Sequence, residues 1–195
     1  MIRSATAHFG EPLFFCPFGL DEMEGLWYNG VVRKGIRRFM MNVDYSKFEF
    51  GKNSHNWWGK IRLDDPDIKK EINVEISSAE DYSLPDSGKA SLEFFLENYP
   101  KYKQILLEAI LEYYQDRRDE YGIDDPNDPD MPEVNDVNTI KTMITFTGMK
   151  VRKEKRFGKN AFGFFFDCTW DPEEGIGIRM SEFNVDKIGI EGIAF

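Results

Sequence analysis

Cysteine and histidine are scarce in this chain, which has two of each among 195 residues. Cys16 and Cys168 are far apart in the sequence and follow no zinc-site or redox spacing. His8 and His55 lie in separate turn-rich segments, with no cysteine or carboxylate near either of them at metal-ligand spacing. The sequence therefore predicts reduced thiols, no disulfide scaffold, no metal site and no cofactor.

Long apolar runs are missing as well. No stretch approaches the roughly 20 apolar residues that cross a bilayer. The short apolar run at 13–15 is interrupted by Pro12 and Pro17, and no small-residue cleavage site follows it, so no signal peptide is predicted. The chain also lacks a G-x-S-x-G turn and a phosphate-binding glycine loop, which gives no support to serine-hydrolase or nucleotide-binding functions. We expect a soluble, cytoplasmic protein.

Positive charge is in deficit. The chain has 25 Lys and Arg against 35 Asp and Glu, for a formal net charge of −10. Such a charge disfavours binding to nucleic acid and to anionic membranes, whereas it attracts a basic protein. Hydrophobic residues at 41% and aromatic residues at 15% are typical of a globular chain with a ring-rich core.

The first 83 residues are rich in β-forming runs separated by Gly, Asn and Asp clusters. The Asn29-Gly30 dipeptide favours the positive backbone φ of a tight hairpin turn within 25–35. The strands that we predict in this part span 12–18, 26–33, 36–43, 58–63 and 72–76.

The middle of the chain, 86–122, predicts one short and one long helix. Asp86 and Ser87 can cap a first helix that ends near Pro100, and Pro100 suits the first turn of the next. Apolar residues from Tyr102 onward then recur at helical spacing, and Gly122 is suited to cap the C-terminal end.

The C-terminal part, 139–195, predicts β-hairpins. Apolar side chains alternate along 162–170 and again along 176–181, with a turn at 171–175 between them. We place an earlier strand on Ile140, Ile144 and Phe146, and a final strand at 185–190. The whole chain, 1–195, is predicted to be one α+β domain: a mainly antiparallel sheet with the helical segment packed on it.

Residues 123–138, which we call the acidic loop, hold three prolines and no periodic pattern, so they predict an exposed loop. The loop lacks the spacing and the glycine of an EF-hand, which argues against calcium. Long loops in compact domains are often functional, so we interpret this one as a partner-binding surface. Its carboxylates are Asp124, Asp125, Asp128, Asp130, Glu133 and Asp136.

A basic run surrounds the predicted hairpin tip that Gly158 closes. Such a run could bind phosphate or an acidic protein surface, but no stacking aromatics interleave it, and a solvated turn is the interpretation that we favour. Its members are Lys150, Arg152, Lys153, Lys155, Arg156 and Lys159.

The segment from Asp167 to Ile178 contains Trp-Asp-Pro-Glu-Glu-Gly-Ile-Gly after an aromatic strand. It resembles the C-terminal hairpin of an uncharacterised bacterial family of unknown function, with a W-D-x-E-x-G-x-G turn. The helix containing 108–114 and the Trp58-Gly59 strand are similar in order to the same group. The resemblance implies a role like that of immunity proteins, which are small acidic partners of toxins.

Three hypotheses follow. The first is a non-enzymatic protein-binding module that masks a basic partner, such as a toxin domain, by electrostatic complementarity. The second is an enzyme that uses Asp167, Asp171 and Glu174, the carboxylates flanking the aromatic hairpin. The third is a structural or oligomer-forming domain, in which surface aromatic residues mediate self-association. For Trp27, Trp57 and Trp58 we favour a place in the core, with a role as an interface anchor as the alternative.

Overall fold

A computed structural model of the chain describes residues 43–68 and 71–195. The predicted strands at 12–18 and 26–33, the hairpin at 25–35 and nearly all of 36–43 lie outside them. The strands are β1 (Glu49–Gly51), β2 (Asn56–Ile61), β3 (Ile72–Ser77), β4 (Ile144–Val151), β5 (Ala161–Cys168), β6 (Ile176–Ser181) and β7 (Asn184–Gly189). The α-helices are α1 (Asp86–Glu97), α2 (Tyr99–Tyr121), α3 (Val137–Thr142) and α4 (Glu154–Phe157), and the 3₁₀ segments are η2 (Tyr45–Lys47) and η3 (Glu191–Ala194).

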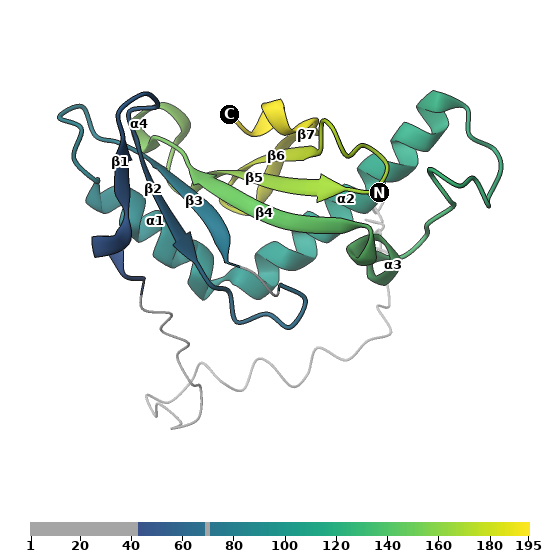
Figure 1. Ribbon diagram of the computed structural model, residues 1–195, viewed down its shortest axis with the longest axis horizontal. Helices are drawn as coiled ribbons and strands as arrows, with labels where there is room; N and C mark the ends of the chain where they lie inside the picture. Colours follow the sequence, from purple (N-terminus) through teal and green to yellow (C-terminus); the bar gives the residue numbers. More distant parts are fainter. Residues whose placement is uncertain (1–42, 69–70) are drawn as a thin grey trace, which may run out of the picture. The chain divides into compact units, whose positions relative to one another are not determined.

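Within the described residues, the strands form one seven-stranded sheet in the order of the sequence, from β1 to β7. Neighbours are antiparallel except β3 and β4, which are parallel. A parallel pair needs a long crossover connection, and α1, α2 and α3 provide it (Figure 1). The predicted α+β class, with a mainly antiparallel sheet and a central helical segment, is confirmed.

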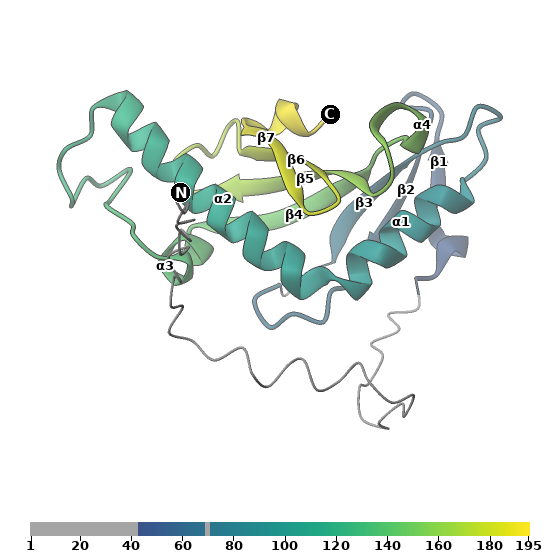
Figure 2. The ribbon, with the colours of Figure 1, turned by 180° about the vertical axis from the view of Figure 1, so that it is seen from behind.

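Helices α1 and α2 cover one face of the sheet, as the view from behind shows (Figure 2). The core between the two layers is built from aromatic rings. Phe95 of α1 and Tyr102 of α2 are fully buried against Phe162 and Phe164 of β5, with ring centroids 5.2 to 6.0 Å apart across these contacts. Gly122 ends α2 in the left-handed conformation, at a φ of 66°, as predicted.

Two predicted boundaries are wrong around α3. Ile140 belongs to this helix and not to a strand, because Asp136 caps the helix by accepting hydrogen bonds from the Asn138 and Thr139 amides. The strand begins only at Ile144, and the acidic loop gives its last two residues to α3. Elsewhere, β2 starts two residues earlier than predicted, and the β5–β6 hairpin pairs as predicted.

The C-terminal segment packs on the other face of the sheet, over β5 and β6. Gly163 and Gly177 lie beneath it, and a Cβ built at either position would come within 2.5 Å of a backbone oxygen of residues 191–194. Only a residue without a side chain allows this close approach. We call this side of the sheet the open face, because Trp58 of β2, which lies on it beyond the segment, stays 41% exposed.

A charged network ties the β2–β3 connection to α2 and α3. The buried Asp65 accepts hydrogen bonds from the Tyr99 hydroxyl at 2.6 Å and from Lys103 Nζ at 3.0 Å. Lys103 also pairs with Asp67 at 2.6 Å, and Asp67 pairs with Lys141 at 3.1 Å. Burial pulls the pKa of Asp65 upward, but the hydrogen bonds from Lys103 and Tyr99 hold it below its ordinary value. Hydrogen bonds from Lys103 and Lys141 likewise lower the pKa of Asp67.

Acid should weaken this network. Because both folded-state pKa values lie below the ordinary 3.8, the stability that these carboxylates contribute is present above that pH. It is lost as the pH falls through 3.8 toward the folded-state values. We expect the free energy of unfolding of a D65N/D67N variant to depend less on pH between about pH 5 and 3 than that of the wild type. Urea unfolding at several pH values measures this, and the exposed neighbour variant D64N should keep the wild-type profile. Parallel profiles for wild type and D65N/D67N would contradict it.

Candidate functional site

The acidic loop leaves the C-terminal end of α2, which projects beyond the sheet, and returns to α3 (Figure 1). Arg118 fixes it from the helix. This arginine is 7% exposed, and its guanidinium donates hydrogen bonds to the main-chain carbonyls of Met131, Ile123 and Asp125. Hydrogen bonds from a charged donor are stronger than neutral ones. One side chain thus connects both arms of the loop to the helix.

Further contacts hold the loop in place. Met131 and Val134 are each 3% exposed and join the hydrophobic core. The Tyr114 hydroxyl donates to the Pro132 carbonyl at 2.5 Å, and Gln115 Nε2 donates to the Val134 carbonyl at 2.9 Å. Most residues of the loop are exposed, as predicted, but two apolar side chains between the carboxylates reach the core and anchor the chain.

The six predicted partner-binding carboxylates fall into two groups. Asp125, Asp128 and Asp136 accept hydrogen bonds from loop or helix amides at 2.8 to 3.0 Å, so they shape the backbone. Hydrogen bonds from Thr139 and Asn138 lower the pKa of Asp136, which keeps its charge. The remaining three, Asp124, Asp130 and Glu133, are exposed. The loop thus presents charge on a fixed backbone.

The open face of the sheet carries a second set of polar residues. Glu75 of β3 is 4% exposed, pairs with Lys150 of β4 at 3.1 Å and accepts a hydrogen bond from Asn56 of β2. Glu75 and Lys150 are directly opposite each other on neighbouring strands, and they belong to one row of paired residues that crosses all seven described strands. The row runs Glu49, Trp58, Glu75, Lys150, Gly163, Arg179 and Lys187.

A small hollow lies beside this ion pair. Its volume is about 130 Å³, and its walls include Trp58, Phe165 and Phe195. The Phe165 and Phe195 rings are 5.1 Å apart, and Lys150 Nζ lies 5.2 Å from the Phe195 centroid. Tryptophan side chains most often fill the core. Trp58 does not, because it is 41% exposed. A larger hollow of about 510 Å³ lies on the other side of Trp58, toward β1.

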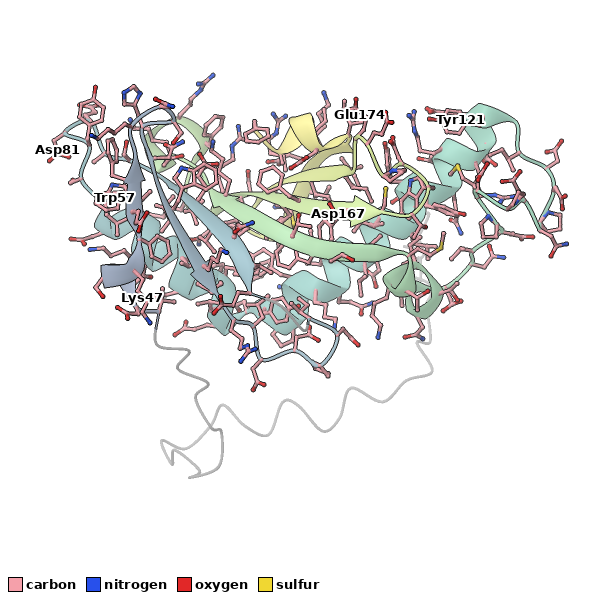
Figure 3. The ribbon with its side chains drawn as sticks, in the orientation of Figure 1. Lys47, Trp57, Asp81, Tyr121, Asp167 and Glu174 are labelled. Carbon is pink, nitrogen blue, oxygen red and sulfur yellow. The ribbon has the colours of Figure 1, made fainter. Side chains whose placement is uncertain are left out.

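The carboxylates of the enzyme hypothesis are not brought together. Asp167 lies over the middle of the sheet and Glu174 beyond its edge (Figure 3). Asp171 accepts a hydrogen bond from the Glu174 amide at 3.2 Å, as in a tight turn, and none of the three residues lines the hollows above. Burial raises the pKa of the nearby Cys168 thiol to about 11, which disfavours the reactive thiolate.

Two absences concern residues 43–68 and 71–195. In this part of the chain, no group of three or more His, Cys, Asp or Glu side chains is placed to hold a metal ion. The helices of the same residues include none with the length and apolar character of a membrane span.

Sequence reasoning missed Arg118 and Glu75. Arg118 continues the buried stripe of α2 four residues after Tyr114, and this spacing was the available signal. Glu75 alternates with Val74 and Ile76, which predicts a solvent-facing side chain, and only the pairing with β2 and β4 reveals its burial.

The fold and these surfaces define an α+β domain with a backbone-anchored acidic loop and a partly covered sheet face. The chain belongs to the family described as "Domain of unknown function (DUF6985)", whose model matches residues 47–195. The comparisons of this chain with curated proteins and with solved structures found no match.

Proposed function

We propose that the protein is a non-enzymatic binding module that recognises a basic protein through its acidic loop. The observation that carries the proposal is the anchoring of the loop by Arg118, which donates to three main-chain carbonyls. A binding surface that is already ordered loses less conformational entropy when a partner docks. The loop is therefore suited to recognition and not merely to connecting α2 with α3.

Charge supports the same interpretation. Asp124, Asp130 and Glu133 are exposed on the anchored loop, and the whole chain carries a net charge of −10. A field of this sign accelerates association with a basic surface and opposes wrong, acidic partners. The resemblance of the C-terminal hairpin to a bacterial family implies the more specific form of this role, an immunity protein that masks a basic toxin in the cytoplasm.

The test compares two variants of equal charge. D124N/D130N/E133Q neutralises the three loop carboxylates that accept no hydrogen bond from a backbone amide of the described residues, and it retains Asp125, Asp128 and Asp136, which shape the backbone. The control E112Q/E173Q/E174Q neutralises three exposed carboxylates elsewhere. A partner captured from source-cell lysate at low salt is identified and purified, and its Kd is measured by calorimetry at two salt concentrations. We expect the loop variant to bind about 10-fold or more weakly and the control to change Kd by less than about 2-fold.

Two results would count against the proposal. If both variants weaken binding equally, net charge and not the acidic loop attracts the partner. If the wild type captures no protein at low salt, the binding-module assignment fails, and the oligomer-forming alternative becomes the leading one, to be tested by light scattering of the concentrated protein.

A further inference from the structure

The largest of the hollows described lies at the other end of the molecule from the acidic loop. Its volume is about 860 Å³, and it lies between the first turns of α1, the β3–α1 connection and the basic β4–β5 connection. We call it the α1 groove. Figure 3 labels Asp81 on the wall of the groove and Tyr121 near the acidic loop, at opposite ends of the view. The groove is rich in hydroxyl groups, with Ser77, Ser78, Ser83, Ser87 and Ser91 in its lining.

The N-terminal end of α1 faces this groove without a cap. Its N-cap residue is Pro85, which makes no side-chain hydrogen bond. Counting from the start of α1, the first backbone amide that donates a hydrogen bond within the described residues is that of Lys89. It donates to the Pro85 carbonyl at 3.1 Å. The amides of Asp86, Ser87 and Gly88 therefore keep free donors at the positive end of a 12-residue helix. Such donors bind anions.

An unpartnered serine gives independent support for a ligand. Ser91 lies one turn further along α1, is 8% exposed and lines the groove. Among the described residues no hydrogen bond of its Oγ is present, and the oxygen is not one of the side-chain atoms fully shut off from solvent, so it is accessible from the groove that the residue lines. A bound group that accepts or donates a hydrogen bond at this point would satisfy it.

The opposite wall supplies positive charge. Arg152 is 7% exposed, stacks on the Phe157 ring at 3.6 Å and donates to the Phe195 carbonyl at 3.3 Å. It forms no ion pair with a described carboxylate. Burial, which removes water from the guanidinium, and then repulsion from Arg179 and Arg156 lower its pKa. Lys153 and Lys159 add two exposed ammonium groups to the lining.

We propose that the α1 groove binds the phosphate group of a small phosphorylated molecule. The phosphate would accept hydrogen bonds from the free α1 amides and the Ser91 hydroxyl, with Lys153 and Lys159 balancing its charge. Asp81 lines the loop side and repels an anion there, which orients the phosphate toward the helix and the ligand's hydroxyl groups toward the loop. The volume of the groove lies in the range of small-molecule sites.

Nuclear magnetic resonance of the ¹⁵N-labelled chain tests this proposal, with inorganic phosphate and glycerol 1-phosphate as probes and sodium chloride at equal ionic strength as reference. We expect both probes to shift the amide signals of Ser87 and Gly88, with glycerol 1-phosphate binding more tightly because it also contacts the serine-rich wall. S91A, which suits a helix, should weaken phosphate binding about 5-fold. K153Q/K159Q should weaken it about 10-fold.

The matched control is K52Q/K60Q, which removes two exposed lysines outside the groove and should leave the affinity unchanged. Equal weakening by both lysine pairs, or shifts that sodium chloride reproduces, would overturn the proposal. So would the absence of any shift at 87–88. Tighter binding of inorganic phosphate than of its glycerol ester would exclude an ester as the ligand. None of these measurements involves the acidic loop. The phosphate-binding proposal can therefore fail while the binding-module proposal stands, and the reverse.

Discussion

Replacement of Arg118 by alanine is expected to lower the free energy of unfolding by about 3 kcal/mol and to release the acidic loop. The change removes the hydrogen bonds to the carbonyls of Met131, Ile123 and Asp125. A lost charged hydrogen bond costs about 1.5 to 3 kcal/mol, and the carbonyls left buried add a desolvation cost. The contributions are not additive, because the three bonds share one donor group and water enters as the loop opens. Urea denaturation measures the total, and hydrogen exchange at 123–136 reports the release of the loop.

The adjacent arginine is the matched control. Arg117 pairs with Glu120 at 2.6 Å and stacks near Tyr121, but its side chain is 29% exposed. Exposed ion pairs contribute little, so R117A should cost less than about 1 kcal/mol and leave hydrogen exchange in the loop unchanged. Similar losses for R117A and R118A, or a loop that stays protected in R118A, would show that Arg118 does not anchor it.

The anchoring connects stability to the proposed function. If partner binding uses the loop in its anchored form, R118A should weaken binding even though all six loop carboxylates remain. The D124N/D130N/E133Q variant, by contrast, would weaken binding without lowering stability. The two variants thus separate the order of the loop from its charge.

Local patterns in the sequence predict most of the described secondary structure. The alternation of apolar residues along β5 and β6 and the helical spacing in α2 are strong signals because a buried face repeats every two residues in a strand and every 3.6 in a helix. Gly122 was predictable as a cap since a left-handed residue favours glycine. The parallel pairing of β3 and β4 was not, because no local pattern records which strands meet across an insertion.

The candidate surfaces were less predictable than the fold. The acidic loop was found from its carboxylates, but its anchoring depends on Met131, Val134 and Arg118, whose burial follows from tertiary packing. The α1 groove depends on segments that lie far apart in the sequence. Its basic side was visible as a charge run, but the sequence did not indicate that Ser91 and Lys159 line the same groove.

Phe95 joins the helices to the sheet. Phe95 is fully buried and contacts Tyr99 and Tyr102 of α2 together with Phe162 and Phe164 of β5. Truncation to alanine leaves a cavity that close-packed neighbours cannot fill, so we expect F95A to lower the free energy of unfolding by about 4 kcal/mol. Because the lost contacts join α1 to the sheet, hydrogen exchange should accelerate along all of α1. Urea denaturation and hydrogen exchange measure the two effects.

The preceding residue supplies the comparison. Phe94 is also a phenylalanine of α1, but it is only half-buried. Its ring centroid lies 5.7 Å from that of Phe183 and 6.5 Å from that of Tyr102. F94A should therefore cost about half as much as F95A, because the transfer free energy scales with the apolar area removed from water. F94A should also leave the backbone amides in the first turns of α1 protected from hydrogen exchange. Equal losses in the two variants would mean that Phe95 does not join the two layers, and the α1 groove, which needs a docked α1, would lose its structural basis.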